Sequence, residues 1–353
     1  NFSEETIKKF QLGYSPKQKD AFSKFALKSS YKEKYLEDAG LSILKNGNAS
    51  DRFRERVMFP IHSFSGRILG FGGRTLQKEN KAKYVNSPES LIYYKSKILY
   101  GIYFAKQQIS KENNCYIVEG YTDVISLHQS GIKNVVSSSG TSLTSEQIKL
   151  INRFTKNITI LFDGDAAGIN ASFRSVDMIL SEGMNVKIVL FPEGEDPDSF
   201  ANKNSQEELK DYLGKKSKDF ITFKTDVLSK NINNDPAKRV GMIKDIASSI
   251  AQIPDDISRS EYIKICSKML SVKELEFSKE VSLQKNKKIN SFPSIEEAGK
   301  KDVDSSSNKR NKEEKEIVRL LLNYGNEALK IEGENISIAN FIIDELRADD
   351  INF

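Results

Sequence analysis

Cys115-Tyr116-Ile117-Val118-Glu119-Gly120-Tyr121-Thr122-Asp123 is the stretch of sequence that decides the fold. Its first four residues form a short run of apolar, β-branched and aromatic side chains, which is typical of a buried parallel strand. A second such run, Ile158-Thr159-Ile160-Leu161-Phe162, is followed by Asp163-Gly164-Asp165. In open α/β sheets the carboxyl ends of the strands lie at one edge, where ligands bind. We therefore expect these acidic residues to meet at that edge.

Carboxylates crowded at one edge repel one another unless a cation or a raised pKa relieves the repulsion. Gly164 lets the backbone turn so that Asp163 and Asp165 both face one point. Mg²⁺ prefers a few carboxylate oxygens, several waters and the phosphates of a substrate. The sequence therefore predicts metal-dependent phosphoryl chemistry, with Mg²⁺ as the natural ion and Mn²⁺ as the alternative. Asp196 and Asp198 follow another strand and either supply a second metal or form a solvated acidic turn.

The composition excludes several classes of protein. At 353 residues the chain is long enough for two or three domains. It contains no apolar run that could span a membrane, and it begins at Asn1 with neither a methionine nor a signal peptide, so we expect a fragment of a longer cytoplasmic protein. Cys115, Cys266, His62 and His128 are too few for a disulfide framework or a zinc site, so we expect no zinc in this chain. We expect His128 on a helix surface.

The charge is unevenly distributed along the chain. Residues 1–112 contain 21 Lys and Arg against 11 Asp and Glu, a net charge of +10, whereas the whole chain carries +5. A basic half joined to an acidic site suits a polyanion that passes bound metals. The alternative is an ordinary Lys-rich surface.

The pattern between residues 113 and 196 alternates strands and helices. We expect strands at 115–118, 134–137, 158–162 and 186–191, and helices from Asp123 to Gln129, from Thr144 to Phe154 and from Ala166 to Leu180. Such alternation predicts βαβ units and a mostly parallel, Rossmann-like sheet. Before it, apolar runs at 57–61 and 68–74 surround a Ser65-Gly66 turn and predict a hairpin. The fold class is therefore α/β.

The domain boundaries follow from shifts in pattern and composition. We expect a basic α+β subdomain at 1–112, the sheet domain at 113–196, and a helical subdomain at 197–285. Residues 286–312 are rich in Lys, Ser and Asp and predict a solvated linker. A new apolar rhythm then predicts a further helical domain over 313–353 that is cut off at Phe353.

Two further groups of residues suggest contacts with phosphates and nucleic acid. The small residues of 137–142, among them Ser139, Gly140 and Thr141, lie between a strand and a helix, so they form either a phosphate cradle or a plain turn. Aromatic side chains beside cations suit single strands, whose bases can stack. The candidate polyanion surface is formed by Arg52, Arg54, Arg56, Arg74, Lys81, Lys83, Lys95 and Lys97 with Tyr84, Tyr93 and Tyr94. Arg52, Arg54 and Arg56 would share one face if their segment is extended.

The chain resembles the bacterial DnaG-type primases. The acidic motifs are similar to those of the Toprim domain, which primases share with topoisomerases and some nucleases. The flanking segments resemble primase in sequence and order: Asp51 to Ile61, Gly70 to Arg74, Lys83 to Pro88, Lys95 to Gly101, and Glu119 to Asp123. The resemblance covers about residues 1–285 and implies a Toprim domain at 113–196. The tail at 313–353 looks like the start of the helicase-binding domain of the family.

The resemblance also implies an activity, the synthesis of short RNA primers from NTPs on single-stranded DNA. Its expected partners are the DNA template, NTPs, the RNA primer and the replicative helicase, with no membrane. Glu119, Asp163 and Asp165 would be the catalytic metal-site acids, completed by Asp196 and Asp198. The NTP would contact Arg74, Lys83, Asn86, Lys95, Asp123, Ser139, Gly140 and Thr141. The DNA would contact Arg52, Arg54, Lys81, Lys97 and Tyr84. The alternatives are a Toprim nuclease or topoisomerase, and a non-catalytic module that binds DNA and helicase.

Overall fold

The computed structural model describes residues 2–77, 82–140, 142–163, 166–230, 235–291, 328–331, 334–337 and 339. The chain divides into two compact units, Asn1–Ile289 and Asn290–Phe353, which are described separately. Asp165, Lys81 and Thr141, three of the expected site residues, lie outside the described residues.

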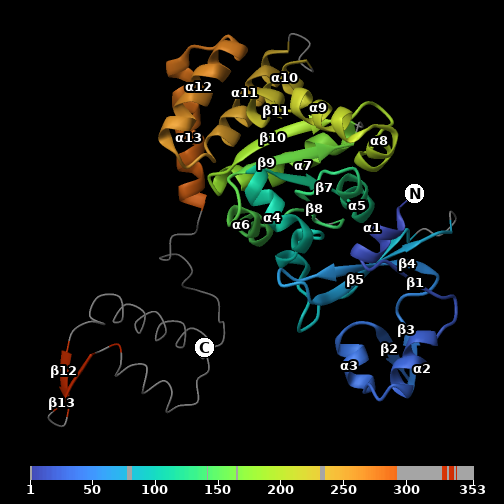
Figure 1. The fold of residues 1–353 in the computed structure, drawn as a ribbon. Coiled ribbons are helices and arrows are strands. Elements are labelled where there is room, and N and C mark those ends of the chain that lie inside the picture. Colours follow the sequence, from blue (N-terminus) through green and yellow to red (C-terminus); the bar gives the residue numbers. More distant parts are fainter. Residues whose placement is uncertain are drawn as a thin grey trace. The chain divides into compact units, whose positions relative to one another are not determined.

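The amino-terminal part is built around a four-stranded antiparallel sheet with the strand order β1-β4-β5-β6 (Figure 1). Its elements are α1 (Glu4–Lys9), β1 (Gly13–Ser15), α2 (Ala21–Lys28), α3 (Glu33–Asp38), β2 (Ser42–Lys45), β3 (Asn48–Asp51), β4 (Arg56–His62), β5 (Ile68–Thr75) and β6 (Tyr84–Asn86). The predicted hairpin is confirmed, because β4 pairs with β5 in antiparallel register. Gly66 has a positive φ of 92°, which explains why glycine occupies the turn.

The central part is a five-stranded sheet with the order β11-β10-β9-β7-β8. Its strands are β7 (Cys115–Val118), β8 (Val135–Ser137), β9 (Asn157–Phe162), β10 (Asn185–Leu190) and the short edge strand β11 (Lys218–Asp219). All neighbours are parallel except β10 and β11, so the predicted mostly parallel α/β sheet is confirmed. The helical elements η1 (Lys95–Lys97) and α4 (Ile102–Glu112) precede these strands, and α5 (Tyr121–Gln129), α6 (Ser145–Asn152) and α7 (Ala166–Ser181) connect them.

Helices continue the chain beyond this sheet. They are α8 (Pro197–Lys203), α9 (Gln206–Lys216), α10 (Phe220–Lys230), α11 (Pro236–Ile250), α12 (Asp256–Leu270) and α13 (Glu274–Ser291). One apolar core joins α4, α6 and α7 to α10–α13, with Ile148 and Phe220 fully buried in it. A second core lies under α5, α8 and α9 and includes Phe59 of β4. The antiparallel sheet and the parallel sheet therefore share apolar packing, which fixes their edges relative to one another.

Two expectations about the end of the chain differ from the structure. Helix α13 extends to Ser291, so the expected linker boundary at residue 286 falls inside a helix. The rest of that linker lies outside the described residues. In the second unit, β12 (Ala328–Ile331) pairs antiparallel with β13 (Glu334–Ser337). These two strands differ from the expected helical domain over 313–353. None of the helices in the described ranges is long and apolar enough to cross a membrane.

Candidate functional site

The carboxyl ends of two neighbouring strands bring the first acidic residues together. Strand β7 pairs in parallel with β9, and Ile117 lies opposite Ile160. Glu119 and Asp163, which follow these strands, therefore leave the sheet at the same edge. Glu119 is exposed, and its backbone carbonyl accepts a hydrogen bond from Ser137 Oγ at 2.7 Å. This bond ties the end of β7 to the loop that follows β8.

Asp123 is the buried member of the acidic group. It lies in the first turn of α5, is only 9% exposed, and accepts a hydrogen bond from Gly120 N at 2.9 Å through Oδ2. Burial raises the pKa of the Asp123 carboxyl to about 7, and the negative charges of Asp196, Asp163 and Asp198 act in the same direction. A like charge disfavours the ionised form of a carboxyl, so these three acids act on Asp123 in the same direction as its burial. This electrostatic coupling relates Asp123 to acids that follow β9 and β10.

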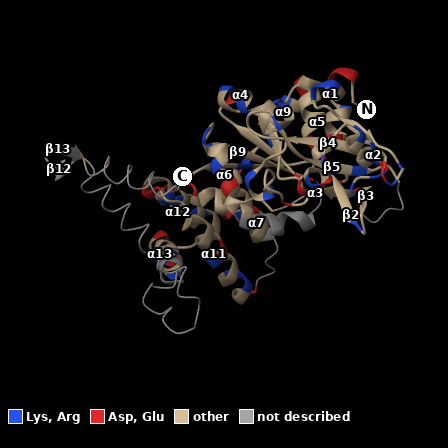
Figure 2. Cartoon of the chain, turned by 90° about the horizontal axis from the view of Figure 1, so that it is seen from below, with Lys and Arg blue, Asp and Glu red and all other residues tan. Residues whose placement is uncertain are grey.

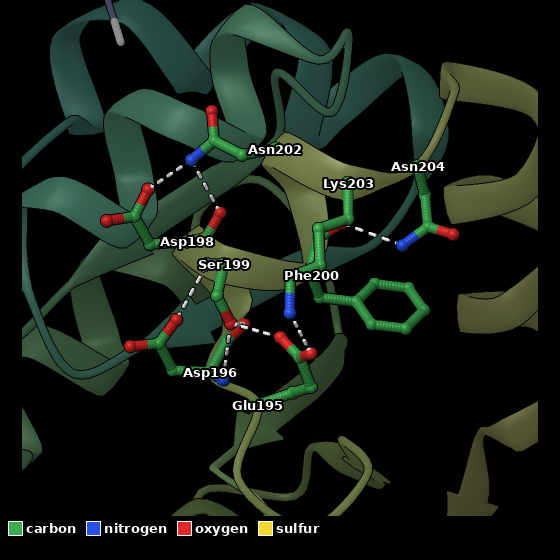
Figure 3. Close-up of polar contacts among 8 residues, drawn as sticks. All are labelled: Glu195, Asp196, Asp198, Ser199, Phe200, Asn202, Lys203 and Asn204. Atoms are coloured by element: carbon green, nitrogen blue, oxygen red, sulfur yellow. Dashed lines mark hydrogen bonds and ion pairs between the residues drawn. The ribbon is translucent and has the colours of Figure 1, made fainter.

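The two remaining aspartates belong to the first turn of α8 and its cap. Asp196 caps α8 by accepting a hydrogen bond from Ser199 N at 2.7 Å. Asp198 accepts hydrogen bonds from Asn202 Nδ2 at 2.8 Å and from Ser126 Oγ of α5. Figure 3 shows both carboxylates on the same side of the helix, away from Phe200. The helix cap and the bond to α5 therefore hold this side of the site in place.

The donors at this edge fit a hard divalent cation. They are carboxylate oxygens, which Mg²⁺ and Mn²⁺ prefer. The mutual repulsion that helps to raise the pKa of Asp123 is the kind that a bound cation relieves. Among the described residues, no three acidic, His or Cys side chains are already gathered at metal-binding distance. Cys115 and Cys266 lie in the apolar core, away from this edge.

A chain of hydrogen bonds links the antiparallel sheet to the acidic edge. Tyr121 OH donates to Asn86 Oδ1 at 2.9 Å, and Asn86 Nδ2 donates to the carbonyl of Ser139 at 3.2 Å. Ser139 and Gly140 both have positive φ values, of 60° and 79°. Asn86 of β6 thus lies between the helix that carries Asp123 and the loop of small residues. Asn86, Ser139 and Gly140, three of the expected NTP contacts, therefore lie close together.

Arg74 is a basic residue of the antiparallel sheet that lies beside the ring of Tyr84. Arg74 pairs with Tyr84 across β5 and β6, and its guanidinium lies 5.6 Å from the centre of the Tyr84 ring. Burial raises the pKa of Tyr84, and Asp123 and Asp198 contribute to this shift with their charges. Arg74 therefore contacts the ring of Tyr84, and the pKa of Tyr84 responds to the charges of Asp123 and Asp198. Lys83 and Lys97 are exposed, and the ammonium of Lys97 lies 5.5 Å from the Tyr94 ring centre.

Comparison with known proteins gives consistent matches along the chain. Residues 1–106 match the family described as the amino-terminal domain of the DNA primase catalytic core, and residues 116–201 match a Toprim-like family. The DNA primase of Halalkalibacterium halodurans is 39% identical over 267 residues, which are 74% of this chain and 44% of that protein. A DNA primase domain from Pseudomonas aeruginosa has 31% identity and a TM-score of 0.71, covering 80% of this chain and 89% of that one.

The chain belongs to the DnaG-type primase family. A further DnaG primase catalytic domain, solved bound to single-stranded DNA, is 32% identical with a TM-score of 0.69 and covers 78% of this chain and 87% of that one. The chain spans about half the length of the curated relatives it matches.

The matches place the helicase-related segment differently from the sequence expectation. The family described as the DnaB-helicase binding domain of primase matches residues 221–274, which comprise α10, α11 and α12. Residues 301–353 match a family of unknown function. The expected helicase-binding domain at 313–353 therefore has its match earlier in the chain, within the helical subdomain.

Several expected surface residues are buried and have structural roles. Arg56 is 7% exposed, and its guanidinium donates hydrogen bonds to the carbonyls of Gly73, Ala82 and Lys83 at 3.0–3.2 Å. Tyr93 is 3% exposed, so its ring belongs to the core rather than to a stacking surface. His128 is also buried, against the expectation of a helix-surface residue, because its ring packs edge-on to Phe10.

The three arginines do not form one extended face. Strand β3 ends at Asp51 and β4 begins at Arg56, so Arg52 and Arg54 lie in the connection between strands. Arg54 is exposed, whereas Arg52 is half-buried. Of the three, Arg54 presents the most accessible charge for a phosphate.

Tyr121 is a site residue that the sequence reasoning did not assign. Its ring stacks on Phe59 of β4, with the ring centres 5.3 Å apart, and its hydroxyl joins α5 to β6 through the bond to Asn86. A Cβ added to Gly72 would lie 2.5 Å from the Tyr121 ring, so only glycine leaves room for it. The signal was present in the sequence, because Tyr121 and Gly72 both lie inside the motifs that carried the resemblance.

Proposed function

We propose that this chain is the polymerising core of a primase, which condenses NTPs into short RNA primers on single-stranded DNA. One observation carries the proposal: Asn86 of the antiparallel sheet is hydrogen-bonded both to Tyr121 of α5, the helix that carries Asp123, and to Ser139 of the loop after β8. The charges of Asp163, Asp196 and Asp198 help to raise the pKa of Asp123, and those of Asp123 and Asp198 help to raise the pKa of Tyr84, which lies beside Arg74. Opposite charges arranged in this way suit a triphosphate held between cations and metal-binding carboxylates.

Glu119, Asp163 and Asp165 are the residues that we propose hold the metal, with Asp196 and Asp198 supporting them. A divalent ion there, Mg²⁺ or Mn²⁺, would neutralise phosphate charge and lower the pKa of the attacking 3′-hydroxyl. Asp196 and Asp198 are held by their hydrogen bonds to Ser199 and Asn202, so the acidic edge needs little reorganisation when a substrate binds.

The remaining residues of the site position the nucleotide and the template. Arg74, Lys83 and Lys95 provide positive charge for the phosphates, and Asn86 is oriented by Tyr121 and Ser139 so that it contacts the nucleotide. The loop of Ser139 and Gly140, in which Gly140 is exposed, contacts the same substrate together with Thr141 and Asp123. We assign the template to Arg52, Arg54, Lys81, Lys97 and Tyr84, whose rings and charges suit an unpaired strand. The similar catalytic domain solved bound to single-stranded DNA supports template binding as such by this chain.

The test separates polymerisation from the rival Toprim chemistries. The chain is given NTPs, Mg²⁺ and single-stranded DNA, with and without a pre-annealed RNA primer. We expect RNA products that require both NTPs and template, and more product with the primer present. Cleavage of the DNA without any NTP requirement would instead support a nuclease. Binding of DNA without either reaction would support a non-catalytic module.

A second proposal concerns the helical subdomain. We infer that residues 221–274 contribute to contact with the replicative helicase, because they match the helicase-binding family of primases. Helices α11 and α12 expose apolar side chains that a partner protein can bury, among them Val240, Ile257 and Ile265. Ile257→Asp should weaken capture of the purified helicase, whereas Leu91→Asp, an equally exposed change outside this segment, should not.

A role in chromosome replication would place the protein in the cytoplasm.

A further inference from the structure

A groove lies at the edge of the parallel sheet opposite the acidic cluster. It has a volume of about 540 Å³ and is lined by the amino-terminal ends of β7, β9 and β10, among them Tyr116, Thr159 and Lys187. Part of α9, including Lys210 and Leu213, forms one wall. Small-molecule sites commonly have volumes of ~300–1,000 Å³. The groove is therefore large enough for a small ligand, and no residue assigned to the proposed polymerase site lines it.

Hydrogen bonds between asparagines hold the rim of this groove. Asn134 Nδ2 donates to the carbonyl of Asn114 at 2.8 Å, and Asn157 Nδ2 donates to the carbonyl of Asn113 at 2.9 Å. Asn185 Nδ2 donates to Asn157 Oδ1 at 2.8 Å. These bonds join the starts of successive strands across the sheet. The rim is thus fixed before any ligand arrives, which lowers the entropic cost of binding.

Helix α9 is held over the groove by a close contact at its start. A Cβ added to Gly131 would lie 2.3 Å from Nε2 of Gln206, the first residue of α9. Gly131 also has a positive φ of 90°, so glycine is required there for two reasons. The wall that carries Lys210 is therefore packed directly against the turn that carries Lys133.

The charges around the groove are mainly positive. Lys133, Lys187 and Lys210 come from the turn before β8, from β10 and from α9, and Figure 2 shows blue segments on α9. Within the described residues, no acidic side chain forms an ion pair with any of the three. The positive charge of Lys133 helps to lower the pKa of the buried His128. Glu112 is the one lining carboxylate in the described part of the chain, and it accepts from Gln108 Nε2 at 2.6 Å.

We propose that this groove is a second nucleotide-binding site that needs no metal. Ammonium groups from three separate elements can converge on one polyphosphate. Between them, Tyr116, Ile132 and Leu213 provide an aromatic and aliphatic floor for a base, and the asparagine amides border it. A ligand with both an aromatic ring and several negative charges matches this combination better than a simple anion does. The proposal goes beyond the polymerase function and does not depend on it.

The test measures binding of ATP to the intact chain in EDTA, where the acidic edge has no metal to hold a triphosphate. We expect the intact chain to bind ATP under these conditions. The double variant Lys187→Gln/Lys210→Gln should have an affinity for ATP lower by about tenfold or more, because two charge-assisted contacts are lost. Lys215→Gln is the matched control, since Lys215 lies on the same helix but pairs with Asp211. Its affinity for ATP should equal that of the wild type.

Three results would overturn the proposal. They are no ATP binding at millimolar concentrations in EDTA, equal affinity of the double variant and the wild type, and equal affinity for ATP and adenosine. Binding of an oligonucleotide to the groove in place of ATP would also contradict it, because it would make the groove a DNA contact. Primer synthesis measured on the same double variant keeps the two functions separate. The double variant should retain activity even when its ATP binding in EDTA is lost.

Discussion

At the scale of single residues, burial controls the charge of His128. Its ring is 7% exposed and packs against Phe10 in the second apolar core. Burial lowers the pKa of His128 to about 4, and the positive charges of Lys9 and Lys133 act in the same direction. The side chain is therefore neutral in the folded protein at neutral pH. In the unfolded chain it takes up a proton near its ordinary pKa of 6.5.

The lowered pKa gives a pH dependence with a definite sign. Between pH 6.5 and about 4 the unfolded chain binds the proton and the folded protein does not, so acid favours unfolding. We expect the free energy of unfolding to fall over this range by up to about 1.4 kcal/mol per pH unit from this group. In His128→Gln that contribution should disappear. Urea denaturation of both proteins across the range measures the slopes, and parallel slopes would refute the assignment.

At the scale of structural elements, β4 to β6 form a compact frame for the nucleotide side of the site. The guanidinium of Arg56 donates hydrogen bonds to three backbone carbonyls near the β5–β6 connection, those of Gly73, Ala82 and Lys83. The ring of Tyr121 lies against β5 where Gly72 leaves space for it. Arg74, Tyr84 and Asn86 depend on this frame for their positions.

Replacing Arg56 tests its structural role. Arg56→Met keeps the apolar stem but removes three hydrogen bonds from a charged, buried donor, so we expect a loss of about 3 kcal/mol of stability. Arg54→Met, at an exposed position two residues earlier, should change stability by less than about 0.5 kcal/mol. It should weaken binding of single-stranded DNA instead. Thermal denaturation and DNA-binding titrations distinguish the two variants, and a stable Arg56→Met protein would contradict the buried role.

Two glycine substitutions test the contact between β5 and α5. Gly72→Ala places a Cβ against the Tyr121 ring, so we expect destabilisation of about 1–3 kcal/mol and a displaced Asn86. Gly241→Ala adds the same methyl group in α11, where nothing lies within 4 Å. Since alanine favours helices, this control should raise stability by up to about 1 kcal/mol. Equal effects of the two changes on the midpoint of unfolding would show that the close contact is not significant.

At the scale of the whole molecule, the regular spacing of apolar residues along the sequence predicted most of the fold. The runs ending at Val118 and Phe162 became β7 and β9, and the hairpin around Gly66 formed as expected. The same patterns could not tell which polar residues are buried. Arg56 alternates with Arg54 in sequence, yet only Arg56 turns inward, because the carbonyls it binds come from β5 and the following loop.

The sequence predicted the acidic residues of the candidate site but missed other parts of it. The acids following β7, β9 and β10 were found because carboxyl ends of parallel strands share one edge. The role of Tyr121 was missed because it depends on the approach of β5 and β6, which are about 35–50 residues away in the sequence. The location of the helicase-related segment at 221–274 was also missed, since amphipathic helices there resemble ordinary core helices.

The central claim is that the acidic edge supports primer synthesis. Extension of an annealed RNA primer on single-stranded DNA, with NTPs and Mg²⁺, tests it most directly in Asp163→Asn. Glu261→Gln, an exposed carboxylate on α12 that pairs with Lys264, is the matched control. We predict that Asp163→Asn lowers the rate by on the order of 100-fold or more while Glu261→Gln stays near wild type. A rate for Asp163→Asn within a few-fold of wild type would contradict the account.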